Sequence, residues 1–339
     1  MEISKESKPK GLLEKYQNLD RAKLLEKIDD DIQELNLLKK QLREDIESQR
    51  ENAPDTNTHK NIESTINNQG SEPSSINEAK QYRQFRQYEL AADRVKLFYK
   101  EQHEKQTVAY NIQARINFKT KIRGRMTVWD ALVKLNNLLD ESDPDTELSQ
   151  IDHALQTAEA IRRDNKPRWF QLVGLIHDLG KLLYFYDSQG QWDVVGDTFP
   201  VGCKFSKKII FHEYFKENPD LKNPLYRTKY GIYSPHCGLD NVMLSWGHDE
   251  YMYHLAKEQT TLPPEALAMI RYHSFYPWHS EGAYKYLMNE KDEEMLKCVQ
   301  EFNPYDLYSK SDVRCDIEEL KPYYLELIDE FFPKKIVEF

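Results

Sequence analysis

The chain has 339 residues, of which 39% are hydrophobic, and carries a formal net charge of −10. This length is enough for one large core or two modest ones, and the negative charge argues against nucleic acid and anionic membranes as partners. The sequence has no apolar leader segment and no run of ~18 apolar residues that could span a bilayer. We therefore expect a cytoplasmic protein whose four cysteines are reduced thiols.

Residues 1–50 are predicted to form an N-terminal amphipathic helix or coiled coil. Between Leu25 and Ile46 apolar residues recur in alternating steps of three and four, with one break at Lys39. The pattern covers about three heptads, which is near the minimum for a coiled coil. A lone amphipathic helix lying on the main domain would show the same pattern. Self-association and partner docking through this segment therefore both stay open.

Residues 51–80 are dominated by Asn, Ser, Thr, Pro and Gly and contain few apolar side chains. Such a segment buries too little surface to offset its ordering entropy, so we expect a disordered linker.

Residues 81–339 are rich in aromatic residues and show helical periodicity over most of their length. They are predicted to form a single, mainly α domain, with a few short strands near 191–202. The expected helices cover 88–117, 127–140, 149–164, 168–186, 206–217, 238–257, 264–275, 280–289, 292–302 and 322–331.

The stretch VGLIHDLGK, residues 173–181, places three ionisable side chains inside an apolar helix. A helix that is apolar on nearly every face is buried on nearly every face, and an ionised group there must be paired or must bind a metal. His177 and Asp178 are adjacent, and Lys181 shares their face. An isolated His–Asp pair of this kind is more typical of a hydrogen-bonded core pair than of a metal site.

Other potential metal ligands also lie in apolar or aromatic surroundings. Asp306 follows a predicted helix start at Asn303-Pro304, and the remaining candidates are His153, His248 and His273. Imidazoles and carboxylates without a thiolate suit a borderline or hard ion. Six ligands exceed the need of one catalytic metal, so the set favours two ions bridged by Asp178. His103 is expected to be exposed, while a supporting role for His236 or His279 stays open.

Several further runs resemble the myo-inositol oxygenase family. They are DESDP (140–144), HALQTAEAIR (153–162), WFQLVGLIHDLGK (169–181), VVGDTFPVGC (194–203), PHCGLDNVMLSWGHDEY (235–251), MIRYHSFYPWH (269–279) and EFNPYDLYSK (301–310). The resemblance covers about residues 82–332. The short HDxGK motif alone would be less specific, because it occurs throughout the HD-domain superfamily.

The resemblance implies an HD-domain-like helical bundle around a non-haem, mixed-valent Fe(II)/Fe(III) centre. One iron would take His153, His177 and Asp306, the other His248 and His273, and Asp178 would bridge them. Asp178 and Lys181 would also have catalytic roles. The implied substrate contacts are Arg86, Asp140, Glu141, Ser142, Lys181, Gly196, Asp197, His273, Ser274 and Lys310.

The implied reaction is cleavage of the myo-inositol ring by O2 to give D-glucuronate, as in inositol catabolism. A neutral polyol offers only hydroxyl groups, so it needs several directional hydrogen bonds. Lys181 and Lys310 could also stabilise a hydroxyl oxygen that becomes an alkoxide. The alternative is an HD-type phosphohydrolase, in which two metals activate water against a phosphorus centre.

Overall fold

The structure is a computed structural model that describes residue 88 and residues 93–142, 149–308 and 315–339. These belong to one compact unit that begins at Gly70. The predicted N-terminal helix (1–50), the predicted linker (51–80), Arg86 and Lys310 lie outside the described residues.

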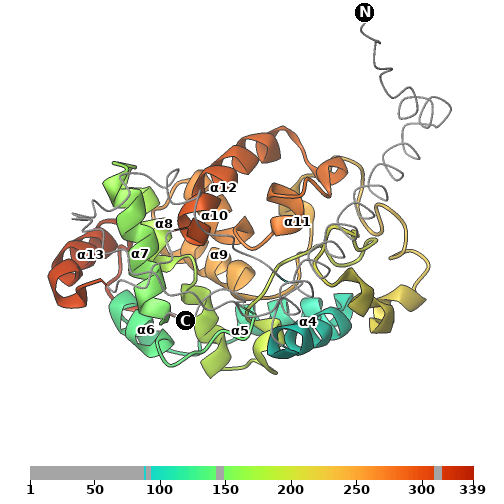
Figure 1. Cartoon of the computed structure of the whole chain (residues 1–339), viewed down its shortest axis with the longest axis horizontal. Coiled ribbons are helices and arrows are strands. Elements are labelled where there is room, and N and C mark those ends of the chain that lie inside the picture. The colour runs from blue at the N-terminus through green and yellow to red at the C-terminus, as the bar shows by residue number, and fades with distance from the viewer. Residues whose placement is uncertain (1–87, 89–92, 143–148, 309–314) are drawn as a thin grey trace, which may run out of the picture. The chain divides into compact units, whose positions relative to one another are not determined.

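The described part of the chain is mainly helical, which confirms the predicted fold class (Figure 1). The α-helices are α4 (Asp93–Lys105), α5 (Val108–Thr120), α6 (Val128–Leu135), α7 (Gln150–Arg163), α8 (Arg168–Ile176), α9 (His248–Gln259), α10 (Pro264–Tyr272), α11 (Tyr276–His279), α12 (Glu290–Tyr308) and α13 (Ile317–Phe331).

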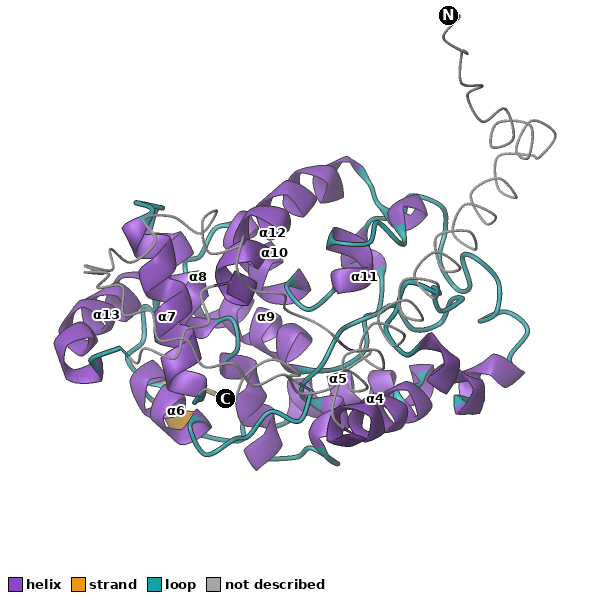
Figure 2. Cartoon of the chain, viewed as in Figure 1, coloured by secondary structure: helices purple, strands orange, loops and turns teal. Residues whose placement is uncertain are grey.

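Loops with short 3-10 turns fill the long connection between α8 and α9 (Figure 2). The 3-10 turns of the described chain are η2 (Leu179–Phe185), η3 (Gln191–Asp193), η4 (His212–Glu217), η5 (Pro219–Lys222), η6 (Leu239–Asn241) and η7 (Lys285–Leu287). Strand β1 (Arg125–Met126) pairs antiparallel with β2 (Val337–Glu338). The expectation of strands near 191–202 is wrong, because that segment contains η3 and contributes only an isolated bridge from Pro200 to Leu244.

Several predicted helices differ from the structure. The helix expected over 168–186 divides into α8 and η2, the helix expected over 206–217 forms only η4, and the helix expected over 238–257 contains η6 and becomes α-helical only at His248. Three other differences have identifiable reasons. The helix expected over 88–117 is two helices, because Thr107 is extended and its side chain caps α5 by accepting from the amide of Tyr110. The helix expected over 280–289 is only η7, and Gly282 and Tyr284 before it have positive φ. By contrast, α12 continues through Pro304 to Tyr308 and no new helix begins at Asn303.

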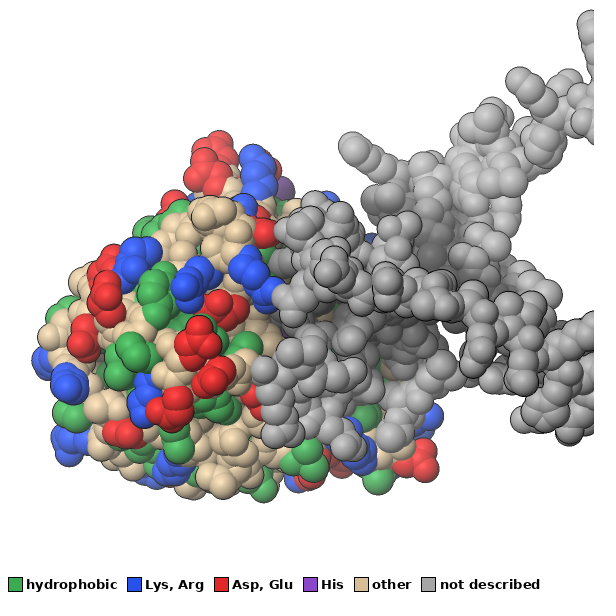
Figure 3. Space-filling view, turned by 60° about the vertical axis from the view of Figure 1, so that its left-hand side comes forward, with side chains coloured by type: hydrophobic (Ala, Val, Ile, Leu, Met, Phe, Trp, Pro, Cys, Tyr) green, Lys and Arg blue, Asp and Glu red, His purple; other side chains and the backbone are tan. Residues whose placement is uncertain are grey.

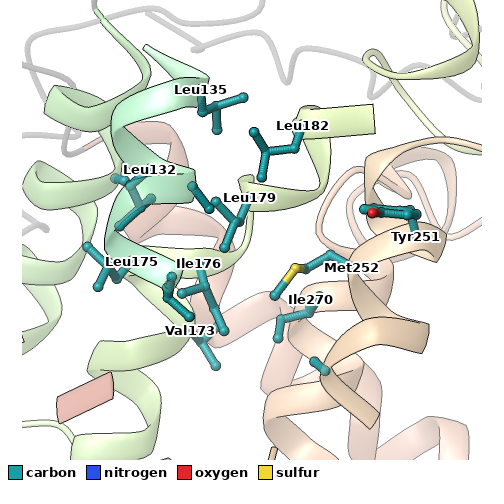
Figure 4. Close-up of a cluster of buried hydrophobic side chains, with 14 of the residues drawn as sticks. Leu132, Leu135, Val173, Leu175, Ile176, Leu179, Leu182, Tyr251, Met252 and Ile270 are labelled. Atoms are coloured by element: carbon teal, nitrogen blue, oxygen red, sulfur yellow. The ribbon is translucent and has the colours of Figure 1, made fainter. Parts of the chain in front are cut away.

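Helix α8 lies in the centre of the main core, as its predominantly apolar sequence predicts. The side chains labelled in Figure 4 come from α6, α8, η2, α9 and α10 and form one buried cluster: Leu132, Leu135, Val173, Leu175, Ile176, Leu179, Leu182, Tyr251, Met252 and Ile270. Burying each of the aliphatic side chains contributes about 1.5–3 kcal/mol. This core surrounds the end of α8, where His177 is fully buried and Asp178 is 6% exposed.

Helices α7 and α8 approach closely because residue 174 is a glycine. A Cβ at Gly174 would lie 2.9 Å from the Cα of Ala158 on α7. The close contact fixes the depth of α7, which carries His153, relative to the end of α8.

On the face of Figure 3 that grey atoms leave visible, acidic and basic side chains are interspersed with scattered apolar ones. Among the described helices, none is both long enough and apolar enough to cross a bilayer.

Candidate metal centre

Six candidate ligands from five helical elements come together in the core. His153 lies on α7, His177 and Asp178 lie at the end of α8, and His248 begins α9. His273 ends α10, and Asp306 lies on α12. The groups that could hold an ion include His153–His177–Asp306 and His177–Asp178–His273.

Backbone carbonyls orient three of the imidazoles. The Nδ1 atoms of His177, His248 and His273 lie 2.9, 2.7 and 2.9 Å from the carbonyl oxygens of Gly174, Val194 and Ile270, respectively. A carbonyl only accepts, so each Nδ1 carries a proton, and in the neutral imidazole each Nε2 carries the lone pair that a metal ion would take. All three lone pairs therefore belong to the nitrogens that face the cluster.

The two oxygens of Asp178 face different pairs of histidines. Its Oδ2 lies 3.6 Å from Nε2 of His153 and 3.5 Å from Nε2 of His177. Its Oδ1 lies 3.3 Å from Nε2 of His248 and 3.6 Å from Nε2 of His273. This arrangement suits a carboxylate that bridges two ions. Asp306 lies on the first side, with Oδ1 3.0 Å from His153 and 3.4 Å from His177.

The donor set fits metal ions better than it fits a purely protein core. Nε2 of His177 is buried and has no hydrogen-bond partner among the described residues. Nε2 of His248 lies 3.1 Å from Nε2 of His273, and with both imidazoles neutral two lone pairs would face each other. Converging lone pairs and buried carboxylates repel one another unless a cation lies between them. Nitrogen and oxygen ligands without sulfur suit a borderline or hard ion such as iron.

The carboxylates also favour positive charge in this part of the core. Burial would lower the pKa of His248, but Asp249 and Asp178 raise it to about 10. Burial would raise the pKa of Asp178, but Lys181 and His177 hold it well below its usual value. The site therefore stabilises cations and keeps Asp178 ionised.

Lys181 connects the metal cluster to the first predicted polyol-binding segment. Its Nζ lies 2.9 Å from Asp178, 2.8 Å from Asp140 and 3.4 Å from the side-chain oxygen of Gln150. Burial would lower the pKa of Lys181, but the Asp140 and Asp178 carboxylates raise it, so the ammonium stays charged. Lys181 is therefore a fixed, charged hydrogen-bond donor beside the cluster.

Residues 140–142 form a short turn beside Lys181. Oδ1 of Asp140 accepts from the amide and the hydroxyl of Ser142 at 2.9 and 2.6 Å. The side chain of Gln191 accepts from the amide of Glu141 at 2.9 Å and donates to the carbonyl of Leu139 at 2.8 Å. Glu141 itself is exposed, and its described contact is made by the backbone.

The second predicted polyol-binding segment, Gly196-Asp197, joins the centre through the backbone. The amide of Thr198 donates to the carbonyl of Ser274 at 2.9 Å. Gly196 has a φ of +87°, which favours glycine, and Tyr99 lies 3.5 Å from Oδ1 of Asp197. Ser274 follows the ligand candidate His273, so the backbone places this segment near the cluster.

The sequence analysis missed Asp249, which is fully buried beside His248 and His273 and forms a third group that could hold an ion. The sequence does contain a pattern that points to Asp249, because the dipeptide His248-Asp249 repeats the dipeptide His177-Asp178. Of the two histidines left open, His279 approaches the centre, with Nε2 2.8 Å from the carbonyl of His273. His236 instead contacts the carbonyl of Met288.

Fold and site together define a helical protein with a buried His–carboxylate centre suited to two metal ions. The family model of myo-inositol oxygenase matches residues 92–339. The chain belongs to the myo-inositol oxygenase family.

Three of the relatives are identical to this chain at about half of the aligned positions. Inositol oxygenase 1 of Arabidopsis thaliana is 54% identical over 262 residues, which cover 75% of this chain and 84% of the relative. Inositol oxygenase of Dictyostelium discoideum is 48% identical over 266 residues, covering 76% and 90%. Inositol oxygenase of Bos taurus is 47% identical over 273 residues, covering 80% and 95%.

Proposed function

We propose that the chain is an oxygenase that cleaves the ring of myo-inositol with O2 to give D-glucuronate. The observation that carries the proposal is the placement of His153, His177, His248 and His273 on the two sides of Asp178. Family membership supports the reaction class, and the relatives named above are inositol oxygenases. We also propose that the catalytic domain spans 81–339 and works in the cytoplasm.

The proposed centre holds two iron ions in a mixed-valent Fe(II)/Fe(III) state. His153, His177 and Asp306 would hold one ion, His248 and His273 the other, and Asp178 would be shared. When bound, the pair would supply the redox chemistry for a four-electron oxidation and would lower the pKa of coordinated hydroxyls. In the overall reaction, one atom of O2 enters the product and the other leaves as water.

The protein side chains then orient the polyol and manage its protons. Asp140, Asp197 and Ser274 can accept from ring hydroxyls, while Lys181 can donate to them. We propose that Lys181 stabilises negative charge on a hydroxyl oxygen as it loses its proton. Arg86 and Lys310 are proposed to add donors, and Glu141 and Ser142 to complete the Asp140 turn.

The main experiment supplies iron-loaded protein with myo-inositol and O2 and measures uronic acid formation together with oxygen uptake. We expect about one O2 consumed per D-glucuronate formed. Hydrolysis of phosphate esters with divalent metals, without oxygen uptake, would favour the phosphohydrolase instead. Family membership already disfavours that alternative.

The ligand assignment is tested by Asp178→Ala. Since both ions would lose their shared carboxylate, we expect activity to fall by at least ~100-fold and bound iron to fall with it. Asp193→Ala is a matched control, because Asp193 is also a buried carboxylate but its described partners are Tyr110 and the backbone of Gln189. Full iron content and turnover in the Asp178 variant would refute the bridging role.

A further inference from the structure

The proposed mechanism assigns no role to Asp249, although this carboxylate is fully buried at the centre. Asp249 contacts Ser274 twice. Oδ2 accepts from the amide of Ser274 at 3.1 Å, and Oδ1 accepts from its hydroxyl at 3.1 Å. Two hydrogen bonds to one residue hold both the backbone and the side chain of Ser274.

The backbone on both sides of Ser274 is held independently of Asp249. The carbonyl of Ser274 accepts from Thr198 at 2.9 Å, and the carbonyl of His273 lies 2.8 Å from Nε2 of His279. With its backbone fixed, the remaining freedom of Ser274 is rotation of its hydroxyl. Asp249 therefore decides where the hydroxyl proton points.

The direction of that proton sets the chemistry that Ser274 offers to a ligand. A carboxylate has no proton to donate, so the hydroxyl of Ser274 must donate to Asp249. The other possible acceptor near the Ser274 hydroxyl is Nε2 of His248 at 3.4 Å, but in the proposed centre the lone pair of this nitrogen binds the metal ion. The lone pairs of the Ser274 oxygen are then left to accept.

We propose that Asp249 is a positioning residue that holds Ser274 as a pure acceptor for one hydroxyl of the polyol. This inference rests on the proposed function, because it takes the ligand to be a polyol. The fixed orientation of the Ser274 hydroxyl makes recognition directional, because the ring must place a donating hydroxyl next to the Ser274 oxygen. An analogue without that hydroxyl would leave the Ser274 oxygen as a buried, unpaired acceptor.

The test is Asp249→Asn, which keeps the shape and changes the hydrogen-bond polarity. The amide of Ser274 still needs an acceptor, so the new carboxamide oxygen takes the place of Oδ2 and its NH2 faces the Ser274 hydroxyl. The hydroxyl then accepts, and its proton turns outward. We expect the Kd for myo-inositol, measured by calorimetry without oxygen on iron-loaded protein, to rise roughly tenfold. Because Oδ1 of Asp249 also lies 2.7 Å from Nε2 of His248, bound iron is measured on the same samples and the Kd values are compared at equal iron content.

Two further variants separate this role from a general structural one. Asp292→Asn makes the same change in a carboxylate that is 2% exposed and accepts from the amides of Leu239 and Asn289 at 2.9 Å each. We expect it to leave the Kd unchanged. In the Ser274→Ala background, Asp249→Asn is expected to add no further loss of affinity, because Asp249 acts through Ser274.

Two results would overturn the inference. One is an additive loss of affinity in the double variant. The other is a loss of bound iron with Asp249→Asn but not with Ser274→Ala, which would place Asp249 on the ion. The proposed function fails separately: unmodified protein that binds myo-inositol but forms no uronic acid would refute the oxygenase and leave the role of Asp249 standing. Absence of binding by the unmodified protein would refute both.

Discussion

Gly180 lies where two parts of the proposed metal centre approach most closely. A Cβ at this position would lie 2.2 Å from the carbonyl oxygen of His248. That oxygen belongs to the backbone at the start of α9, so the clash could be relieved only by moving the ligand candidate His248. The glycine therefore allows Lys181 and His248 to reach the same cluster.

We expect Gly180→Ala to destabilise the fold by about 1–3 kcal/mol and to reduce bound iron, because His248 would be displaced. Thermal unfolding and metal analysis measure the two effects. Gly247→Ala is the comparison, since a Cβ there would meet its nearest neighbour, the carbonyl oxygen of Val194, at 3.2 Å. Equal effects of the two changes would contradict the steric argument.

At the scale of elements, α4 and η4 enclose a histidine that the sequence analysis expected to be exposed. His103 is fully buried, stacks on Phe215 with ring centroids 4.0 Å apart and approaches the carbonyl of Phe211 with Nδ1 at 3.2 Å. Burial lowers its pKa to about 3. The exposure prediction was wrong because the partner surface of η4 is more than 100 residues away in the chain.

His103 makes the packing of α4 on η4 sensitive to acid. Its pKa is lower in the folded than in the unfolded chain, so its stabilising contribution is complete above about pH 6.5 and is lost as pH falls toward 3. Between pH 7 and pH 4 the loss is about 3 kcal/mol. We expect the free energy of unfolding of the His103→Leu variant, measured by urea titration at each pH, to decrease less between pH 7 and pH 4 than that of the unmodified protein. Identical pH slopes for the two proteins would refute the assignment.

For the whole molecule, bound metal and folding are expected to be linked. The ligands reach the centre from α7, α8, α9, α10 and α12, so ions held there would tie these helices together. Without ions, the carboxylates of Asp178 and Asp306 would lose the positive charge that the ions supply. At saturating metal the stabilisation is about 3 kcal/mol, so a strong chelator should lower Tm by roughly 5–10 °C. Complete removal of iron with no change in Tm would contradict this linkage.

The first 80 residues are expected to be dispensable for the chemistry. The family match begins at residue 92, and the compact unit that contains the described residues begins at Gly70. We predict that a chain starting at residue 81 keeps its iron content and its kcat/KM within about twofold. A larger loss would assign residues 1–80 a part in catalysis. Comparing the oligomeric states of the two chains tests the prediction of self-association.

The sequence by itself determined the mainly α fold and the candidate ligands, because both depend on local patterns. A charged residue in an apolar helix such as α8 can be recognised without any knowledge of its spatial neighbours. The order of the family motifs then indicated the remaining ligands and the substrate contacts. The linker and the N-terminal helix stay predictions. Helix boundaries were mispredicted where Thr107 and Gly282 determine the backbone conformation.

Only the tertiary structure decided how the side chains meet. Contacts such as Asp249 with Ser274, His103 with Phe215 and the two-sided placement of Asp178 join residues 25 or more positions apart. Local periodicity determines which face of a helix is apolar, but it does not determine which distant carbonyl orients a histidine or which carboxylate turns a hydroxyl. Those choices follow from the packing of α7, α8, α9, α10 and α12 around one buried point.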